Sequence, residues 1–247
     1  MKKCDLAKHY AHRGLHDKPS IPENSMAAFE RAVKHGFPVE FDVHLIADGS
    51  LVVFHDEDLE RETGIKGRIE DRTFSELSGY RLEGTDEKIP SFDEVLDLFD
   101  KTQLSLLIEL KAAGGNHRAL ADAVCNRLAG YKGPYVIESF DPRALMEVRK
   151  ISPDTAVGQL SQDFVKNREG LPLWQAIILK NMMFNIKISP DFIAYKYEDT
   201  NVFAARAAIR RGVPVAVWTI RNNDDYQNAI NEGFVPIFEQ LKYEDIS

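Results

Sequence analysis

Apolar residues occur along this chain in short runs, which alternate with longer segments where apolar and polar residues recur at helical spacing. The short runs are rich in Val, Ile, Leu and Phe, and their length and composition are typical of buried strands. The sequence therefore predicts eight strands, over residues 7–11, 38–43, 104–110, 135–138, 155–160, 184–188, 213–219 and 234–238.

The segments between these runs carry signals for the start and the end of helices. Asn24-Ser25 and Asp141-Pro142 are typical of helix starts, and four of the segments end at a glycine. We expect helices over residues 24–35, 117–129, 142–151, 200–211 and 222–231.

Strands that alternate with helices indicate a parallel sheet with crossover helices. Eight strands are the number that closes such a sheet into a TIM (β/α)8 barrel, and 247 residues are an ordinary length for that fold. We therefore expect a single domain over residues 1–247.

One segment departs from the alternation. Residues 43–51 are too few for a crossover helix, and Ala47-Asp48-Gly49-Ser50 is typical of a tight turn. A strand over 51–54 is therefore expected to run antiparallel to the second strand. We predict that residues 44–90 form a hairpin and a small insertion on the rim of the barrel. Short helices are expected over 74–80, within the insertion, and over 92–100, after it.

Composition and charge are those of a globular protein that does not bind nucleic acid. Hydrophobic residues make up 44% of the chain, and the formal net charge is −8 with no evident basic face. Cys4 and Cys125 have neither metal-site nor disulfide spacing, which favours a reducing compartment. No secretory signal or membrane-length apolar stretch is evident, so we expect a cytoplasmic protein without stable membrane insertion.

Two apolar features allow alternative interpretations. Residues 171–184 are either an outer helix with its adjoining loop, which we favour, or a lid that receives a lipid-like substrate. Trp218, near the end of the seventh predicted strand, is either a core residue or a wall of the substrate pocket. We include it among the candidate substrate-binding residues.

Carboxylates cluster where the second and third predicted strands end, which is where such barrels carry catalytic residues. Glu40 and Asp42 are two residues apart and face the same side of a strand, and Glu109 ends the next strand. Three converging carboxylates repel one another unless a cation lies among them, and oxygen ligands suit Mg²⁺, Ca²⁺ or Mn²⁺. The alternative is a set of salt bridges, such as Glu109 with Lys111 or Arg13.

Two histidines complete the candidate chemistry. His12 and Arg13 follow the first strand, and His55 follows the hairpin strand. Attack on a phosphate ester needs one group to remove a proton and another to supply one, while a cation and a guanidinium neutralise the phosphoryl oxygens. Taken singly, each histidine could be structural, and Arg13 could pair with Glu40 or Glu23. Taken together, the residues predict a metal-dependent phosphodiesterase.

An ordered series of motifs extends this pattern over most of the chain. Its members are His12-Arg13-Gly14, Pro22-Glu23-Asn24-Ser25, Glu40-x-Asp42-Val43, Asp48-Gly49, Val53-Phe54-His55-Asp56, Arg61-x-Thr63, Gly67, Ile108-Glu109-Leu110-Lys111, Glu138-Ser139-Phe140 and Val217-Trp218-Thr219. In this order and spacing they resemble the glycerophosphodiester phosphodiesterase family.

The resemblance implies hydrolysis of small glycerophosphodiesters to sn-glycerol 3-phosphate and an alcohol, by a barrel whose insertion carries the second histidine. It implies a bound divalent ion, Mg²⁺ or Ca²⁺. By position, the acid–base pair would be His12 and His55, the metal ligands Glu40, Asp42 and Glu109, and the phosphate contacts Arg13 and Lys111.

The chain departs from the family pattern at two places. Ile46 stands where the family usually has Thr or Ser, which we expect to alter only the hairpin. The last strand reads Ile237-Phe238-Glu239-Gln240 in place of Thr-Asp-x-Pro, which we expect to change the pocket wall. Two alternatives remain: the same chemistry on lysophospholipids or phosphoinositide-type substrates, and a non-catalytic protein that binds metal or phosphate. The sequence makes no prediction of oligomeric state.

Overall fold

The computed structural model describes residues 6–168, 170–242 and 246, so that Cys4 lies outside the described residues. Eight parallel strands close into a barrel, because β1 pairs with both β2 and β9. The barrel order is β1-β9-β8-β7-β6-β5-β4-β2. The strands are β1 (Tyr10–His12), β2 (Val39–Leu45), β4 (Leu106–Leu110), β5 (Tyr135–Ser139), β6 (Val157–Ser161), β7 (Phe192–Lys196), β8 (Val215–Ile220) and β9 (Val235–Phe238).

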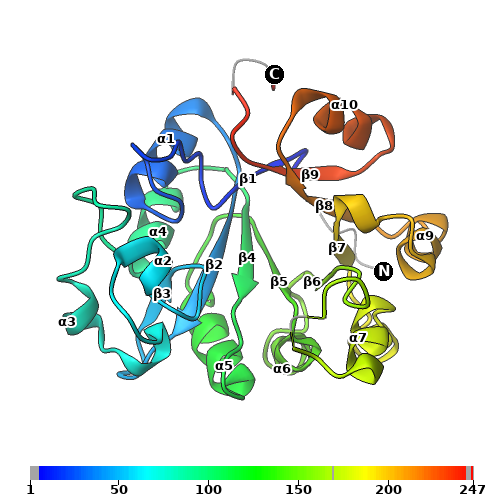
Figure 1. Cartoon of the computed structure of the whole chain (residues 1–247), viewed down its shortest axis with the longest axis horizontal. Coiled ribbons are helices and arrows are strands. Elements are labelled where there is room, and N and C mark those ends of the chain that lie inside the picture. Colours follow the sequence, from blue (N-terminus) through cyan, green and yellow to red (C-terminus); the bar gives the residue numbers. More distant parts are fainter. Residues whose placement is uncertain (1–5, 169, 243–245, 247) are drawn as a thin grey trace.

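Helices surround these strands on the outside (Figure 1). Ser25, Asp141 and Asn222 cap three of them through their side chains, which agrees with the start signals at the first two positions. The TIM-barrel prediction is confirmed, and the predicted helix bounds differ by a few residues. The helices are α1 (Met26–His35), α4 (Phe92–Phe99), α5 (His117–Leu128), α6 (Pro142–Ile151), α7 (Leu173–Lys180), α8 (Asn185–Ile188), α9 (Phe203–Arg210) and α10 (Asn223–Asn231), with a short 3-10 helix η2 (Tyr197–Asp199).

One predicted strand is wrong. Residues 184–188 form the short helix α8, and the barrel strand expected there is β7, which follows Ser189-Pro190. A short apolar run does not distinguish a buried strand from a helix by its periodicity. Here Ile188 is buried while Ile186 is 90% exposed, which is not the burial of a barrel strand.

The second strand is longer than predicted, so Glu40 and Asp42 lie within it rather than at its end. The extra length arises because β2 continues beyond the rim and pairs with β3 (Leu51–Val53). This pairing is antiparallel, as the turn at 47–50 predicted.

The rest of the insertion folds around a small core of its own. Its elements are α2 (Glu60–Thr63), the 3-10 helix η1 (Ile69–Asp71) and α3 (Phe74–Leu77), which is shorter than the predicted 74–80. They lie with β3 beside β2 (Figure 1). Ile46 is part of this core, so the departure noted there changes packing in the hairpin. The core residues are Ile46, Val52, Phe54, Leu59, Ile69, Leu77, Leu82 and Ile89.

Inside the barrel, a compact apolar cluster fills the space among the strands. It is separate from the larger core between the strands and the outer helices. Its buried members are Tyr10, Leu107, Val136, Leu160, Phe192, Ala194, Ala216 and Ile237. Further along the same inward-facing rows come polar side chains, including His12, Glu109 and Glu138, because successive inward positions are two residues apart.

Gly158 has no side chain because the Phe192 ring occupies that space. The two residues are register partners on β6 and β7, and a Cβ at position 158 would overlap the ring. We predict that Gly158→Ala lowers the free energy of unfolding by about 1–3 kcal/mol or more, through overpacking of the barrel interior. Urea denaturation measures the change. Gly130→Ala is the matched control, since a Cβ at Gly130 meets no atom within 4 Å; an equal effect of both substitutions would contradict the explanation.

Candidate active site

A cavity of about 990 Å³ contains the candidate chemistry. His12, Glu40, Glu109 and Trp218 line it from four barrel strands, and His55 lines it from the segment after β3. Arg13 and Lys111 also line it, directly after β1 and β4. The sequence-predicted residues therefore meet in one place, as the rule that loops after parallel strands share one end of the barrel requires.

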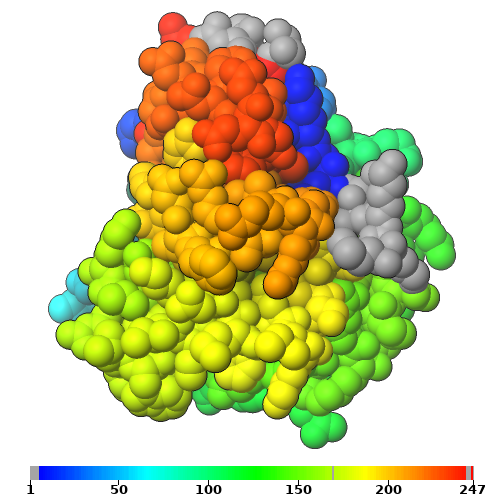
Figure 2. All heavy atoms as spheres, turned by 90° about the vertical axis from the view of Figure 1, so that its right-hand side faces the viewer, coloured from blue at the N-terminus to red at the C-terminus, as the bar shows by residue number. Residues whose placement is uncertain are grey.

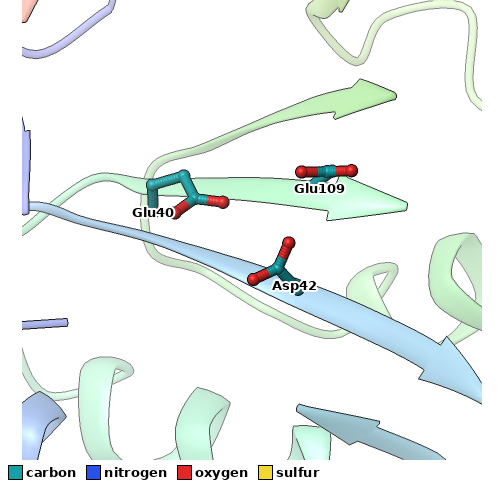
Figure 3. A group of neighbouring side chains, drawn as sticks. All are labelled: Glu40, Asp42 and Glu109. Carbon is teal, nitrogen blue, oxygen red and sulfur yellow. The ribbon is translucent and has the colours of Figure 1, made fainter. Parts of the chain in front are cut away.

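Three carboxylates converge beside this cavity (Figure 3). Glu40 and Asp42 lie on β2, and Glu109 lies on β4 as the register partner of Asp42. One oxygen from each side chain lies within 4.8 Å of the others, and the residues are only 2%, 1% and 7% exposed. Ionised carboxylates are rarely buried this closely without a compensating positive charge.

Burial and mutual repulsion favour the protonated form of two members of this triad. Burial, followed by the charges of Asp42 and Glu109, raises the pKa of Glu40 well above its usual value. Burial also raises the pKa of Glu109 to about 7, although the adjacent Lys111 opposes the shift. A divalent cation among these oxygens would favour their ionised form, so the acidic triad fits a divalent metal site.

Two protein cations already balance part of this charge. Arg13 Nε lies 3.6 Å from Asp42 Oδ2, and Lys111 Nζ lies 3.5 Å from Asp42 Oδ1 and 3.1 Å from Glu109 Oε1. Although burial raises it, the pKa of Asp42 is held below its usual value by the nearby His55, Lys111 and Arg13. The Glu109–Lys111 salt bridge considered as an alternative is thus present, and it coexists with the triad.

Unpartnered oxygens supply a further test of the fit. Asp42 Oδ1 and Glu138 Oε2 are buried and accept no hydrogen bond from the described residues. Glu138 lies on β5 as the register partner of Glu109, is 1% exposed and also lines the cavity. In the sequence, Glu138 stands out only as part of the motif Glu138-Ser139-Phe140. Burial raises the pKa of Glu138 well above its usual value. Ionised carboxylate oxygens are the ligands that Mg²⁺ and Ca²⁺ prefer, so a bound cation would favour ionisation of these groups.

His12 is oriented by a carboxylate at the end of the barrel sheet. Its Nδ1 donates to Glu239 Oε2 at 2.6 Å, and its Nε2 lies 3.8 Å from Glu40 Oε2. Burial and the positive charge of Arg13 lower the pKa of His12 to about 4, outweighing the opposite effect of Glu239. The imidazole is therefore neutral near pH 7, with Nε2 on the side of the triad.

His55 has a carboxylate partner of the same kind. Its Nδ1 donates to Asp56 Oδ1 at 2.5 Å, and burial lowers its pKa. Its backbone carbonyl accepts from His44 Nε2 at 3.3 Å, while His44 Nδ1 lies 2.8 Å from Glu70 Oε1. His44, to which the sequence assigned no role, is fully buried and fixes the backbone that carries His55.

Glu23 holds Arg13 in place and joins it to the insertion. Its carboxylate accepts from Arg13 Nη1 at 2.6 Å, from Arg61 Nη2 at 2.9 Å and pairs with Lys18 Nζ at 2.7 Å. Arg61 in turn contacts Asp56. The sequence suggested Glu23 first as a helix-start residue and second as support for Arg13, and it lies just before α1 while making that contact.

The turn after β1 brings the Arg13 backbone to the triad. Arg13 and Gly14 both have positive φ, 55° and 81°, and the backbone N–H of Arg13 donates to Glu40 Oε2 at 3.0 Å. Only glycine fits at position 14, because a Cβ there would lie 2.9 Å from that of Ala28 on α1.

Trp218 lines the cavity and also packs against the apolar cluster inside the barrel. Its ring lies edge-on to Phe140, with 5.5 Å between the ring centroids, and both residues line the cavity. Its indole N–H has no hydrogen-bond acceptor among the described residues.

Comparisons with known proteins agree with one another. The sequence profile of the "Glycerophosphoryl diester phosphodiesterase family" matches residues 12–239. A glycerophosphodiester phosphodiesterase of Caldanaerobacter subterraneus is 29% identical over 90% of this chain and 89% of its own. Lysophospholipase D GDPD1 of Homo sapiens is 37% identical, but over only 42% of this chain and 37% of its own. An Oleispira antarctica phosphodiesterase, solved with sn-glycerol-3-phosphate, has the same fold with a TM-score of 0.82 and 24% identity over 98% of this chain and 96% of its own.

The raised pKa of Glu109 makes cation binding depend on pH. A cation must displace the proton that this carboxyl holds below a pH of about 7. We predict that the apparent affinity for Mg²⁺, Ca²⁺ or Mn²⁺ rises between about pH 5.5 and 7.5, with release of protons. Calorimetric titrations in buffers of different ionisation enthalpy measure both quantities.

Asp42→Asn tests the site directly. It should abolish the rise in melting temperature that the cation causes in the wild-type protein. Asp97→Asn is the control, because Asp97 has an 80% exposed side chain on α4. A cation-induced shift that survives Asp42→Asn, or an affinity independent of pH, would refute the assignment.

Proposed function

We propose that this chain, which belongs to the glycerophosphoryl diester phosphodiesterase family, hydrolyses small glycerophosphodiesters to sn-glycerol 3-phosphate and an alcohol. The chain is thus an enzyme of the phosphodiesterase class, and the product is our proposal. The observation that carries it is the meeting of two carboxylate-oriented imidazoles, a buried guanidinium and an acidic triad at one cavity.

We infer that Arg13 and Lys111 bind the phosphoryl oxygens of the substrate. Glu23 holds the guanidinium of Arg13 at the cavity, and burial does not neutralise it because nearby carboxylates raise its pKa. A guanidinium can donate two parallel hydrogen bonds to a phosphate. Lys111 adds a second positive charge on the neighbouring strand end. Trp218 would form the wall against which the glycerol or alcohol part packs.

His12 and His55 act as the acid–base pair in this proposal. One neutral imidazole takes a proton from the nucleophile, which is water or the 2-hydroxyl of the glycerol, as its bond to phosphorus forms. The other ring must start as an imidazolium, protonated at both nitrogens, and gives its Nε2 proton to the alcohol oxygen as the bond between that oxygen and phosphorus breaks. Where the 2-hydroxyl of the glycerol is the nucleophile, a cyclic phosphate forms and water then opens it. Glu239 and Asp56 hold the two rings by Nδ1, which leaves each Nε2 for proton transfer.

Glu40, Asp42 and Glu109 would hold the divalent ion, Mg²⁺ or Ca²⁺. When bound, such an ion supplies positive charge that stabilises the phosphoryl oxygens in the transition state. The insertion supplies His55 to the same cavity as the barrel residues. For this reason we propose that the whole chain acts as one catalytic domain, with residues 44–90 as an insertion at its rim.

Lysophospholipids are a second candidate substrate, because of one specific observation. Six residues of the segment 171–184 line the cavity, and most of them are apolar: Leu171, Trp174, Gln175, Ile178, Leu179 and Phe184. The segment forms α7 and the turn after it, which agrees with the outer helix that the sequence favoured. Its place in the cavity lining supports the other interpretation, a lid that receives a lipid-like substrate. An apolar wall of this kind would accept an acyl chain, in line with the partial match to a lysophospholipase D.

A product assay separates the two candidates. We expect release of sn-glycerol 3-phosphate from glycerophosphocholine, glycerophosphoethanolamine or glycerophosphoinositol with Mg²⁺ or Ca²⁺, and none with EDTA. A glycerol 3-phosphate dehydrogenase assay detects the product. Activity that persists after complete metal removal would overturn the metal dependence. Faster release of choline from lysophosphatidylcholine, with lysophosphatidic acid as the other product, than from glycerophosphocholine would establish the second candidate.

The acid–base pair makes a sharper prediction. His12→Ala and His55→Ala should each lower kcat/KM by roughly a hundredfold to ten-thousandfold, because each removes one proton transfer. Circular dichroism and the cation-induced shift in melting temperature should stay as in the wild type. His35→Ala is the matched control, since His35 lies in the last turn of α1 and does not line the cavity. Near-normal turnover of either active-site variant would remove that histidine from the mechanism.

A further inference from the structure

Large apolar side chains are exposed along one short stretch of the surface. Leu173, Trp174, Ile177, Met183 and Ile186 are 49%, 63%, 43%, 56% and 90% exposed. We call these five residues the apolar rim. They are five of the eight large hydrophobic residues that are exposed among the described residues, and they fall within fourteen positions of the chain. Such a concentration marks an interaction surface, whereas single exposed apolar residues do not.

The charge of this stretch is opposite to that of the protein. The chain has 39 acidic residues, yet none of them occurs from Gly170 to Pro190. The charged residues in that stretch are Lys180 and Lys187, of which Lys187 is exposed, and it is preceded in the sequence by the exposed Arg168 and by Glu169. An apolar surface with a tryptophan and basic neighbours is typical of a segment that lies at the interface of an anionic lipid bilayer.

The helix α7 has two distinct faces. Trp174 and Ile178 line the cavity, whereas Leu173 and Ile177 are one position earlier in each turn, do not line it and are exposed. Ser161 Oγ donates to the carbonyl of Leu179 at 2.8 Å, and Tyr195 donates to that of Lys180 at 3.0 Å. The helix is thus fastened to the barrel by its polar groups, while Leu173 and Ile177 on its outer face are left about half exposed by the described residues.

Figure 2 views the molecule from this side, where the yellow-green to yellow residues form a continuous part of the surface. This part adjoins the cavity, because Trp174 belongs both to the rim and to the cavity lining. No helix in the described ranges is long and apolar enough to cross a bilayer. A surface contact therefore suits the segment, and it would place the cavity mouth at the level of lipid head groups.

We propose that the apolar rim docks the protein onto the surface of an anionic phospholipid bilayer. Leu173, Ile177, Met183 and Ile186 insert among the head groups, with Trp174 at the edge of the cavity. Lys187 and Arg168 contact the anionic head groups. Docking does not require turnover, so it stands or falls independently of the proposed function.

Vesicle sedimentation tests this proposal with the full-length protein. We expect it to sediment with vesicles of phosphatidylcholine and phosphatidylglycerol in equal parts, and much less with pure phosphatidylcholine or at high salt. The double variant Ile177→Ser/Ile186→Ser should lose at least roughly tenfold in affinity for the vesicles, because two apolar side chains no longer leave water on binding. Lys187→Glu should weaken binding to the mixed vesicles.

The controls keep the outcomes separate. Ile151→Ser, on α6, changes an isoleucine that is 38% exposed and outside the rim, and should bind as the wild type does. Neither Ile177 nor Ile186 lines the cavity, so the double variant should keep wild-type turnover of soluble glycerophosphocholine. Failure of the wild type to sediment, or equal binding by the double variant, overturns the proposal. So does a change from dimer to monomer in the double variant on size exclusion, without vesicle binding, since a second copy would then cover the rim.

Discussion

The structure depends on the burial of three acidic side chains close together at one end of a barrel. Glu40, Asp42 and Glu109 are almost fully buried within reach of one another, where water cannot screen their repulsion. The surrounding residues are arranged around that constraint. Arg13 and Lys111 lie against Asp42, the Arg13 backbone donates to Glu40, and Asn24 donates to Asp42 at 3.0 Å. Arg13 and Lys111 also line the cavity.

The two histidines come from different parts of the molecule, and each is held by a carboxylate partner. His12 comes from the barrel and His55 from the insertion, but each is held through Nδ1 by a carboxylate and faces the same cavity. The barrel and the insertion must therefore keep a fixed relative position for the proposed acid–base pair to act together. Glu23, Arg61 and Lys18 provide that link, since Glu23 contacts Arg13 on the barrel and Arg61 on the insertion. The insertion also needs a core of its own, because so short a strand as β3 would not hold His55 alone.

Local patterns in the sequence predicted most of this fold, because burial of strands and capping of helices are local properties. The eight-stranded barrel, the antiparallel hairpin and the meeting of the candidate residues at one end followed from spacing and from the rule for strand ends. The prediction of a strand at 184–188 was wrong because the period of a short apolar run does not distinguish a strand from a helix. The same run gave no sign that Ile186 would be exposed at the surface. The partner of His12 was also beyond local reasoning, since Glu239 is 227 residues away. Its position at the end of the last strand was the one available signal.

The apolar cluster inside the barrel has a consequence for molecular traffic. Apolar side chains fill the space among the strands, so the interior of the barrel is a packed core and not a channel. They include those of Tyr10, Leu107, Phe192 and Ile237. Molecules therefore reach the two imidazoles, and leave them, from the end of the barrel at which the cavity lies. A bulky leaving group would then stand in the path of the next solvent molecule, and the order in which the two halves of a cleaved molecule exit would govern how soon another cycle begins.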